Sequence, residues 1–198
     1  GDSASIAVAV AIISALKEIG IESPTKIQTE AIPMILSGSD VIGMSKTGSG
    51  KTAAFGIPLL EQIVPRAGLQ AIIMSPTREL AVQISQEMEK FGKNLNIKVA
   101  TIFGGVGMDS QVRDLKRSEI VVGTPGRLLD HMRRRSINLS KIRCAVLDEA
   151  DRMVDMGFIK DVENIIRGLP KERQMLLFGA TLSEEIEYIK NRYMKTPK

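Results

Sequence analysis

The sequence predicts an α/β fold, a doubly wound and mostly parallel sheet with helices on both faces. Three observations lead to this prediction. Six short apolar runs of five or six residues recur along the 198 residues, and stretches with apolar residues three and four positions apart lie between them. Strands that alternate with helices are typical of parallel sheets. Polar and glycine residues cluster directly after nearly every run, so we expect them at the carboxyl edge of the sheet, where such folds bind ligands.

The expected elements follow one another in a regular order. The predicted strands are residues 40–44, 70–75, 98–103, 119–123, 144–148 and 175–179. Helical spacing is clearest at Leu80, Ile84, Met88 and Phe91, and again over residues 162–169. An apolar run at residues 6–16 indicates either a packed helix before the sheet or a partly foreign N-terminus, and this run is too short to span a bilayer. We therefore expect a helical segment at residues 1–19 and one core domain at residues 20–198.

The composition is that of a single globular domain. A hydrophobic fraction of 43% is enough for one sizeable core. The net charge of +4 permits an anionic partner without demonstrating one. The single cysteine, Cys144, excludes an internal disulfide, so we expect a reducing compartment, either the cytoplasm or the nucleus.

The turn after the first predicted strand has the composition of a phosphate site. Its end reads Thr-Gly-Ser-Gly-Lys-Thr, and it lies between a predicted strand and a predicted helix, as a P-loop requires. Glycines let backbone N–H groups face phosphate oxygens, and a helix N-terminus attracts anions. Lys51 would reach the β- and γ-phosphates, and Thr52 would bind Mg²⁺. The residues that we assign to nucleotide binding here are Ser45, Thr47, Gly48, Ser49, Gly50, Lys51 and Thr52.

One position departs from the P-loop pattern. Ser45 stands where the general P-loop pattern has its first glycine. The alternative is a turn rich in glycine and serine with a chance lysine.

An acidic cluster at residues 148–151 follows the fifth predicted strand. At a strand end, Asp148 would hold Mg²⁺, largely through water, and Glu149 would polarise the attacking water. Acidic residues at strand ends are otherwise common as helix caps or solvated charges. The cluster is therefore informative only together with the P-loop.

Seven short motifs occur in the order of one family. They are residues 24–28 (Pro-Thr-Lys-Ile-Gln), 45–52, 76–81 (Pro-Thr-Arg-Glu-Leu-Ala), 104–105 (Gly-Gly), 124–127 (Thr-Pro-Gly-Arg), 148–151 (Asp-Glu-Ala-Asp) and 179–181 (Gly-Ala-Thr). Through them the chain resembles the first RecA-like domain of the DEAD-box RNA helicases over residues 20–181. The resemblance implies a RecA-like fold, hydrolysis of ATP with Mg²⁺, and RNA as the partner.

The resemblance also implies roles for individual side chains. Gln28 would read the adenine edge, although Thr25 and Gln28 also form a capping-box pattern. The positions that correspond to contacts with single-stranded RNA are Pro76, Thr77, Arg78, Gly105, Thr124 and Arg127. Hydroxyls, backbone N–H groups and arginines suit contact with phosphates of any sequence.

These RNA-contact positions have local alternatives. The prolines can end strands, the threonines can cap helices, and Arg78 can pair with Glu79. Asp151, Gly179 and Thr181 correspond to the link between the ATP site and the RNA site in the family. Thr181 can instead cap a helix through the Thr-x-x-Glu pattern that it starts.

The sequence departs from the family pattern at three places. Residues 1–17 contain no aromatic residue, whereas the family usually has one that stacks on adenine. Ile21 also stands where members of the family often have an aromatic residue after the glycine. Gly179 stands where the family has a serine whose hydroxyl helps to link the two sites. We therefore expect weaker packing on adenine and altered coupling, with nucleotide binding intact.

The implied activity needs a second RecA-like domain, which supplies arginine fingers worth about 10³–10⁵ in rate. No such arginine motif follows residue 181, so we expect this domain alone to be nearly inactive. The alternatives are an ATP-gated RNA clamp with little unwinding and a motor directed at DNA.

The arginines at 133–135 predict a solvated helix end, and we assign no chemistry to His131.

Overall fold

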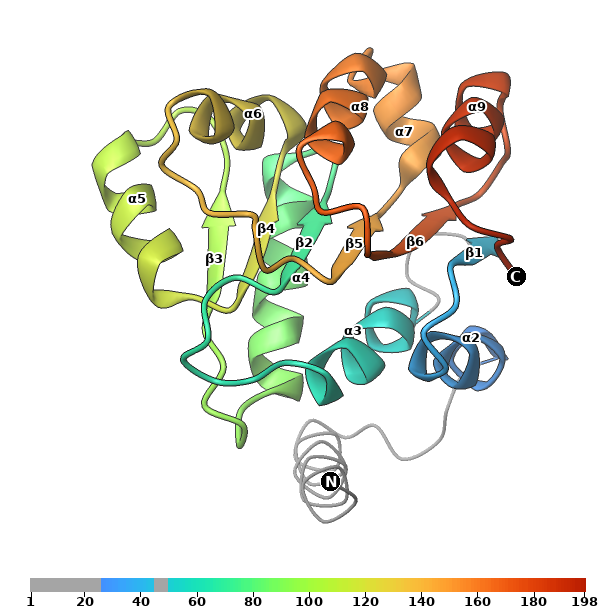
Figure 1. The fold of residues 1–198 in the computed structure, drawn as a ribbon, viewed down its shortest axis with the longest axis horizontal. Helices are drawn as coiled ribbons and strands as arrows, with labels where there is room; N and C mark the ends of the chain where they lie inside the picture. The colour runs from blue at the N-terminus through green and yellow to red at the C-terminus, as the bar shows by residue number, and fades with distance from the viewer. Residues whose placement is uncertain (1–25, 45–49) are drawn as a thin grey trace.

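The computed structural model describes residues 26–44 and 50–198. Its centre is a parallel sheet of six strands in the order β1-β6-β5-β2-β4-β3 (Figure 1). The strands are β1 (Val41–Met44), β2 (Ala71–Met74), β3 (Val99–Ile102), β4 (Ile120–Gly123), β5 (Cys144–Leu147) and β6 (Gln174–Gly179). Each lies within a residue or two of a predicted run, so the predicted strands and the α/β class are confirmed.

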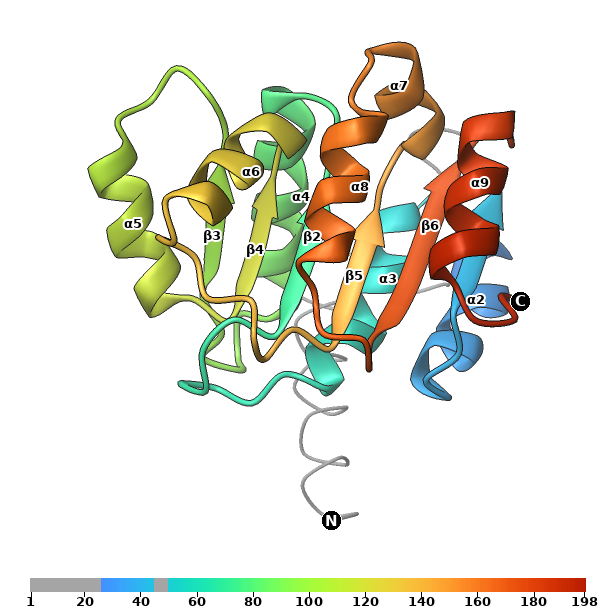
Figure 2. The same cartoon turned by 45° about the horizontal axis from the view of Figure 1, so that its top comes forward.

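Helices cover both faces of the sheet (Figure 2). One face carries α2 (Lys26–Leu36), α3 (Lys51–Glu61) and α4 (Arg78–Phe91). The other carries α5 (Met108–Arg117), α6 (Pro125–Arg133), α8 (Ile159–Arg167) and α9 (Glu184–Tyr193). The short helix α7 (Ala150–Asp155) follows β5 at the carboxyl edge.

The four inner strands, β2, β4, β5 and β6, are buried on both faces because helices cover each face of the sheet. In β2, Ile72 and Met74 pack into one core, whereas Ala71 and Ile73 pack into the other. Strands covered on both faces are apolar throughout rather than alternating. The apolar runs of the sequence therefore identified the strands without a period of two.

The strand order brings the candidate chemistry together. β6 lies between β1 and β5, so the end of β6 lies between the end of β1, the strand before α3, and the acidic cluster after β5. Because all the strands are parallel, the predicted clusters that the structure describes lie at the same edge of the sheet.

The helix caps differ in part from the predictions. Thr77 caps α4, since its Oγ1 accepts a hydrogen bond from the N–H of Leu80 at 3.2 Å. Thr124 occupies the N-cap of α6 without a side-chain hydrogen bond. The alternative role of Thr181 as a cap is excluded, because Ser183 is the N-cap of α9 and its Oγ accepts a hydrogen bond from the N–H of Ile186 at 3.3 Å.

The predicted helix at residues 1–19 and the capping residue Thr25 lie outside the described residues. Within the part of the chain that the structure describes, no helix has the length and apolar character needed to cross a membrane.

Candidate functional site: a lysine and a carboxylate at the carboxyl edge

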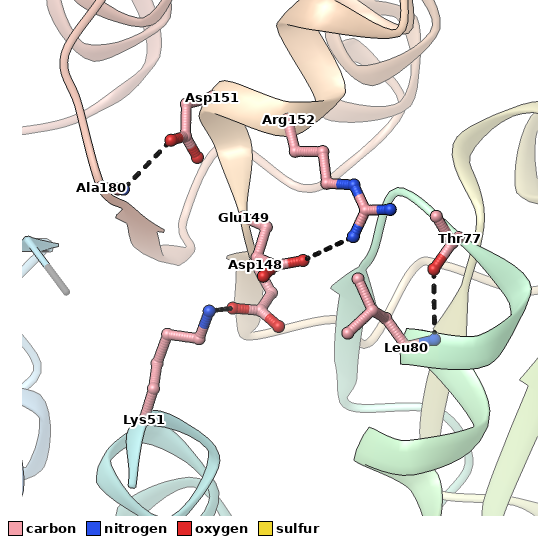
Figure 3. Close-up of polar contacts among 8 residues, drawn as sticks. All are labelled: Lys51, Thr77, Leu80, Asp148, Glu149, Asp151, Arg152 and Ala180. Carbon is pink, nitrogen blue, oxygen red and sulfur yellow. Dashed lines mark hydrogen bonds and ion pairs between the residues drawn. The ribbon is translucent and has the colours of Figure 1, made fainter. Parts of the chain in front are cut away.

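A buried ion pair lies at the centre of the site. Lys51 begins α3, and Asp148 follows the last residue of β5. Lys51 Nζ lies 2.7 Å from Asp148 Oδ1 (Figure 3). Only 6% of the lysine and 3% of the aspartate are exposed. The structure therefore brings together Lys51, predicted to bind phosphate, and Asp148, predicted to hold Mg²⁺.

The environment of Asp148 works against its charged form. Burial raises the pKa of this carboxyl, and the neighbouring Glu149 adds to that effect. Lys51 opposes both by its charge and its hydrogen bond. A buried carboxylate of this kind depends on a nearby cation to remain ionised.

Gln28 reaches the same site from α2. Its side chain is buried, and its Nε2 donates a hydrogen bond to the carbonyl oxygen of Gly50 at 3.1 Å. Gly50 caps α3 with φ 77° and ψ 18°, a left-handed conformation that glycine adopts readily. Gln28 thus fixes α2 to the turn that carries Lys51, whichever role its amide has toward a nucleotide.

A cavity of about 440 Å³ opens beside these groups. Its lining includes Gln28, Gly50, Lys51, Thr52, Asp148 and Glu149, together with residues of α4. Four residues assigned to nucleotide binding, Ser45, Thr47, Gly48 and Ser49, lie outside the described residues.

Glu149 turns the chain from β5 into α7. Its backbone is left-handed, with φ 50° and ψ 52°, which is uncommon for a residue with a side chain. Glu149 Oε2 lies 3.7 Å from Arg152 Nη1. This conformation sets the glutamate beside Asp148 at the cavity (Figure 3).

Asp151 connects the acidic cluster to the end of β6. Its Oδ2 accepts a hydrogen bond from the N–H of Ala180 at 3.2 Å. A Cβ placed on Gly179 would lie 3.0 Å from Asp151 Oδ1. The two predicted coupling positions are therefore in contact, whereas Thr181 is exposed.

The predicted RNA-contact residues lie along the ends of β2, β3 and β4. Arg78 is exposed, and its guanidinium lies 4.6 Å from the centre of the Phe103 ring. Gly105, with φ 84°, needs the conformational freedom of glycine. Pro76 is buried, so it shapes the turn rather than offering a surface.

Arg127 ties these loops together. Its Nη1 donates to the carbonyl oxygen of Val106 at 2.9 Å and to Gln111 Oε1 at 3.3 Å. Thr124 and Arg127 are both half-buried. Arg127 thus braces the loop that contains Gly105 against the start of α6.

A buried network surrounds His131, to which the sequence analysis assigned no chemistry. His131 Nε2 lies 2.8 Å from Gln111 Oε1, and its Nδ1 lies 2.7 Å from Ser136 Oγ. Gln111 Nε2 donates to the carbonyl oxygen of Phe103 at 2.8 Å, so Gln111 Oε1 accepts from both His131 and Arg127. Burial, and then the charge of Arg127, lower the pKa of His131. Gln111 comes from α5, 20 residues before His131, and no local pattern could have paired the two.

The fold and the site define a class of protein. A parallel sheet with a lysine at the start of the first following helix, facing a carboxylate at a strand end, is a nucleotide-binding α/β domain. Residues 25–189 match the DEAD/DEAH box helicase family. The chain belongs to this family.

Similar proteins support this family assignment. The chain is 49% identical over 189 residues to the DEAD-box ATP-dependent RNA helicase CshA of Bacillus subtilis, covering 94% of this chain and 38% of that protein. It is similar to the structure of a DEAD box protein from Methanococcus jannaschii, with a TM-score of 0.92 and 45% identity over 94% of this chain and 52% of the other. A hypothetical ATP-dependent RNA helicase from Sulfolobus tokodaii gives a TM-score of 0.88 at 37% identity, covering 95% of this chain and 55% of the other.

The chain spans less than two fifths of the length of the curated relative and about half of each solved chain. The comparisons confirm the family resemblance and the RecA-like fold of the prediction.

Proposed function

We propose that this chain is the ATP-binding core of an ATP-dependent RNA helicase. It binds ATP with Mg²⁺, holds the backbone of single-stranded RNA at the carboxyl edge, and with a second RecA-like domain couples ATP hydrolysis to local separation of RNA strands. The observation that carries the proposal is the buried pair of Lys51 and Asp148 beside a cavity that Gln28 also lines. The similar helicases named above support the choice of RNA and ATP.

The residues present fit a magnesium nucleotide. The described residues hold no cluster of three histidine, cysteine or acidic side chains that could bind a metal by themselves. Mg²⁺ usually binds through one or two carboxylates, waters and substrate phosphates. Asp148 and the hydroxyl of Thr52 would hold it in this way, and Mg²⁺ would neutralise charge on the phosphate oxygens.

The side chains of this domain would divide the work. Lys51 would exchange its bond to Asp148 for the β- and γ-phosphates, and the free N–H groups at the start of α3 would face the same oxygens. Glu149 would orient and polarise the attacking water. Gln28 would bond the adenine edge while it keeps α2 against Gly50.

RNA contact and coupling are assigned to the neighbouring loops. Thr77, Arg78, Gly105, Thr124 and Arg127 would contact the sugar-phosphate backbone, with Pro76 shaping the turn. Asp151 and Gly179 would link this surface to the ATP site, since they meet between β5 and β6.

The curated relatives from Bacillus subtilis and Listeria monocytogenes are bacterial, which favours a cytoplasmic location over a nuclear one.

The test is ATP hydrolysis and strand separation by the full-length protein. Lys51→Ala should abolish RNA-stimulated hydrolysis, because the lysine neutralises charge that develops on the transferred group. It also leaves Asp148 buried without its cation, at a cost of about 3–5 kcal/mol, so thermal unfolding must be measured alongside.

Glu149→Gln provides a second test that keeps the shape of the side chain and leaves the ion pair between Lys51 and Asp148 intact. It should bind Mg²⁺-ATP while it hydrolyses slowly. Wild-type turnover in a folded Lys51→Ala variant would overturn the assignment. RNA-stimulated hydrolysis without strand separation would indicate a clamp instead, and equal stimulation by matched DNA would indicate a different motor.

A further inference from the structure

Two adjoining depressions lie at the amino edge of the sheet, opposite the ATP site. The larger, about 560 Å³, is lined by residues of α5, the end of α6 and the loop before β5. The smaller, about 320 Å³, lies beside the amino ends of β2, β3 and β4. Both include Gly68 and Lys116, so they are continuous. We name this surface the basic groove, and its charged members are Arg66, Lys98, Lys116, Arg117, Arg134, Arg135 and Lys141, with Glu119.

Within residues 26–44 and 50–198, no acidic side chain pairs with the cations of the basic groove. All seven basic residues are exposed, and among the described residues none of them forms an ion pair. Glu119 is the one acidic residue among those that line the groove, and it is buried with its Oε1 accepting from the backbone N–H of Lys98 at 3.1 Å. Exposed cations on one surface without counter-charges attract a polyanion.

The local fold explains how these cations gather. Lys116 and Arg117 end α5, and Arg134 follows the last residue of α6. Cations at helix C-termini are favourable on their own, so the local sequence at residues 133–135 predicts only a solvated helix end. The tertiary structure adds what the sequence lacked, because it sets the ends of two helices against loops from two other strands.

The loops of the basic groove adopt specific conformations. Arg66, Asn96 and Arg135 have left-handed backbones with φ of 63°, 56° and 57°. Such conformations are strained for residues with side chains and persist only where the surrounding structure holds them. Arg66 and Arg135 are therefore held at defined turns within the groove.

We propose that the basic groove binds the sugar-phosphate backbone of RNA beyond the segment held at the carboxyl edge. The proposal rests on the proposed function, and it adds a second contact on the opposite edge. The groove spans the amino ends of β5, β2, β4 and β3, about 14 Å at the usual strand spacing. Lysines and arginines without aromatic or carboxylate partners suit phosphates and carry no base specificity.

A triple neutralisation in the full-length protein tests the proposal. The groove variant is Lys98→Gln with Lys116→Gln and Arg134→Gln. The matched control is Lys171→Gln with Arg192→Gln and Lys195→Gln, which removes the same charge from exposed residues near the β6 and α9 side of the sheet. The probe is a long fluorescent oligouridine, and its affinity is measured as a function of salt.

The groove variant should bind this RNA about 10- to 100-fold more weakly at about 0.1 M salt, with a salt slope lower by about two, because each single-strand phosphate contact contributes roughly 0.7 to that slope. The control should keep the wild-type slope. Equal slopes in the two triple variants would overturn the proposal. Selective loss of binding to phosphatidylglycerol vesicles, with RNA affinity unchanged, would overturn it in favour of a membrane.

Arg78→Gln, at the carboxyl edge, separates this inference from the proposed function. If Arg78→Gln weakens RNA binding and the groove variant does not, the second contact is wrong and the function stands. If neither weakens it, RNA binding at both edges fails. Crosslinking of wild-type protein to 4-thiouridine RNA gives an independent reading, since peptides of the groove should be labelled.

Discussion

Gly179→Ser is the substitution that most directly tests coupling. The backbone of Gly179 is not in the left-handed region, so a side chain is compatible with its conformation. A Cβ there would lie 3.0 Å from Asp151 Oδ1 and 3.4 Å from its Cγ. The aspartate must move by a few tenths of an ångström, and a serine hydroxyl could then donate to Oδ1 while Oδ2 keeps its bond to Ala180.

The expected gain follows from one hydrogen bond. Such a bond contributes about 0.5–1.5 kcal/mol, which is about two- to tenfold in an equilibrium. We expect strand separation per ATP hydrolysed to rise by about that factor, if the link between Asp151 and the end of β6 limits coupling. ATP affinity should stay the same, because the new hydroxyl lies at a different strand end from Lys51.

The assay measures ATP hydrolysis and duplex separation side by side on the same RNA with the full-length protein. Gly179→Ala is the matched control, since it adds the same Cβ without the hydroxyl. Because the alanine only crowds Asp151, strand separation per ATP hydrolysed should fall or stay the same in Gly179→Ala. A serine variant that behaves like the alanine variant, or like wild type, would refute the reasoning.

Three further predictions concern nucleotide choice, packing and pH. Gln28→Ala should narrow the difference in affinity between ATP and GTP; a change in thermal stability alone would favour a structural role for its bond to Gly50. Gly123→Ala should destabilise the fold by about 1–3 kcal/mol, because the new Cβ would lie 2.7 Å from a carbonyl oxygen of β3. Gly126→Ala is the control: the space around Gly126 is open, so this variant should be neutral or stabilising in the same thermal melt. Because the folded pKa of His131 is below its ordinary value of 6.5, the unfolded chain binds more protons on acidification and stability falls as pH drops below that value. Urea unfolding measured above and below pH 6.5 should show a smaller loss of unfolding free energy on acidification for His131→Gln than for the wild type. Equal losses would contradict a contribution of His131 to the pH dependence of stability.

Much of the site could be predicted because its residues are close together in sequence. The turn before α3 and the cluster after β5 are short motifs, each bounded by an apolar run that was recognisable by itself. Parallel strands then require that all strand ends of one sense share an edge. The meeting of Lys51 and Asp148 followed from these two facts, although their 2.7 Å separation and deep burial did not.

The sequence by itself determined the strands, the family motifs and the edge of the sheet where they lie, because these depend on local composition and on burial of both faces of each strand. Only the tertiary structure decided which distant residues meet. It placed the end of β6 between β1 and β5, so that Gly179 contacts Asp151. It also gave the cap of α9 to Ser183 instead of Thr181, since the chain after β6 runs two residues further before the helix begins. The network of His131 and the basic groove arise from packing between the ends of helices and loops far apart in the chain, and no sequence spacing encodes such packing.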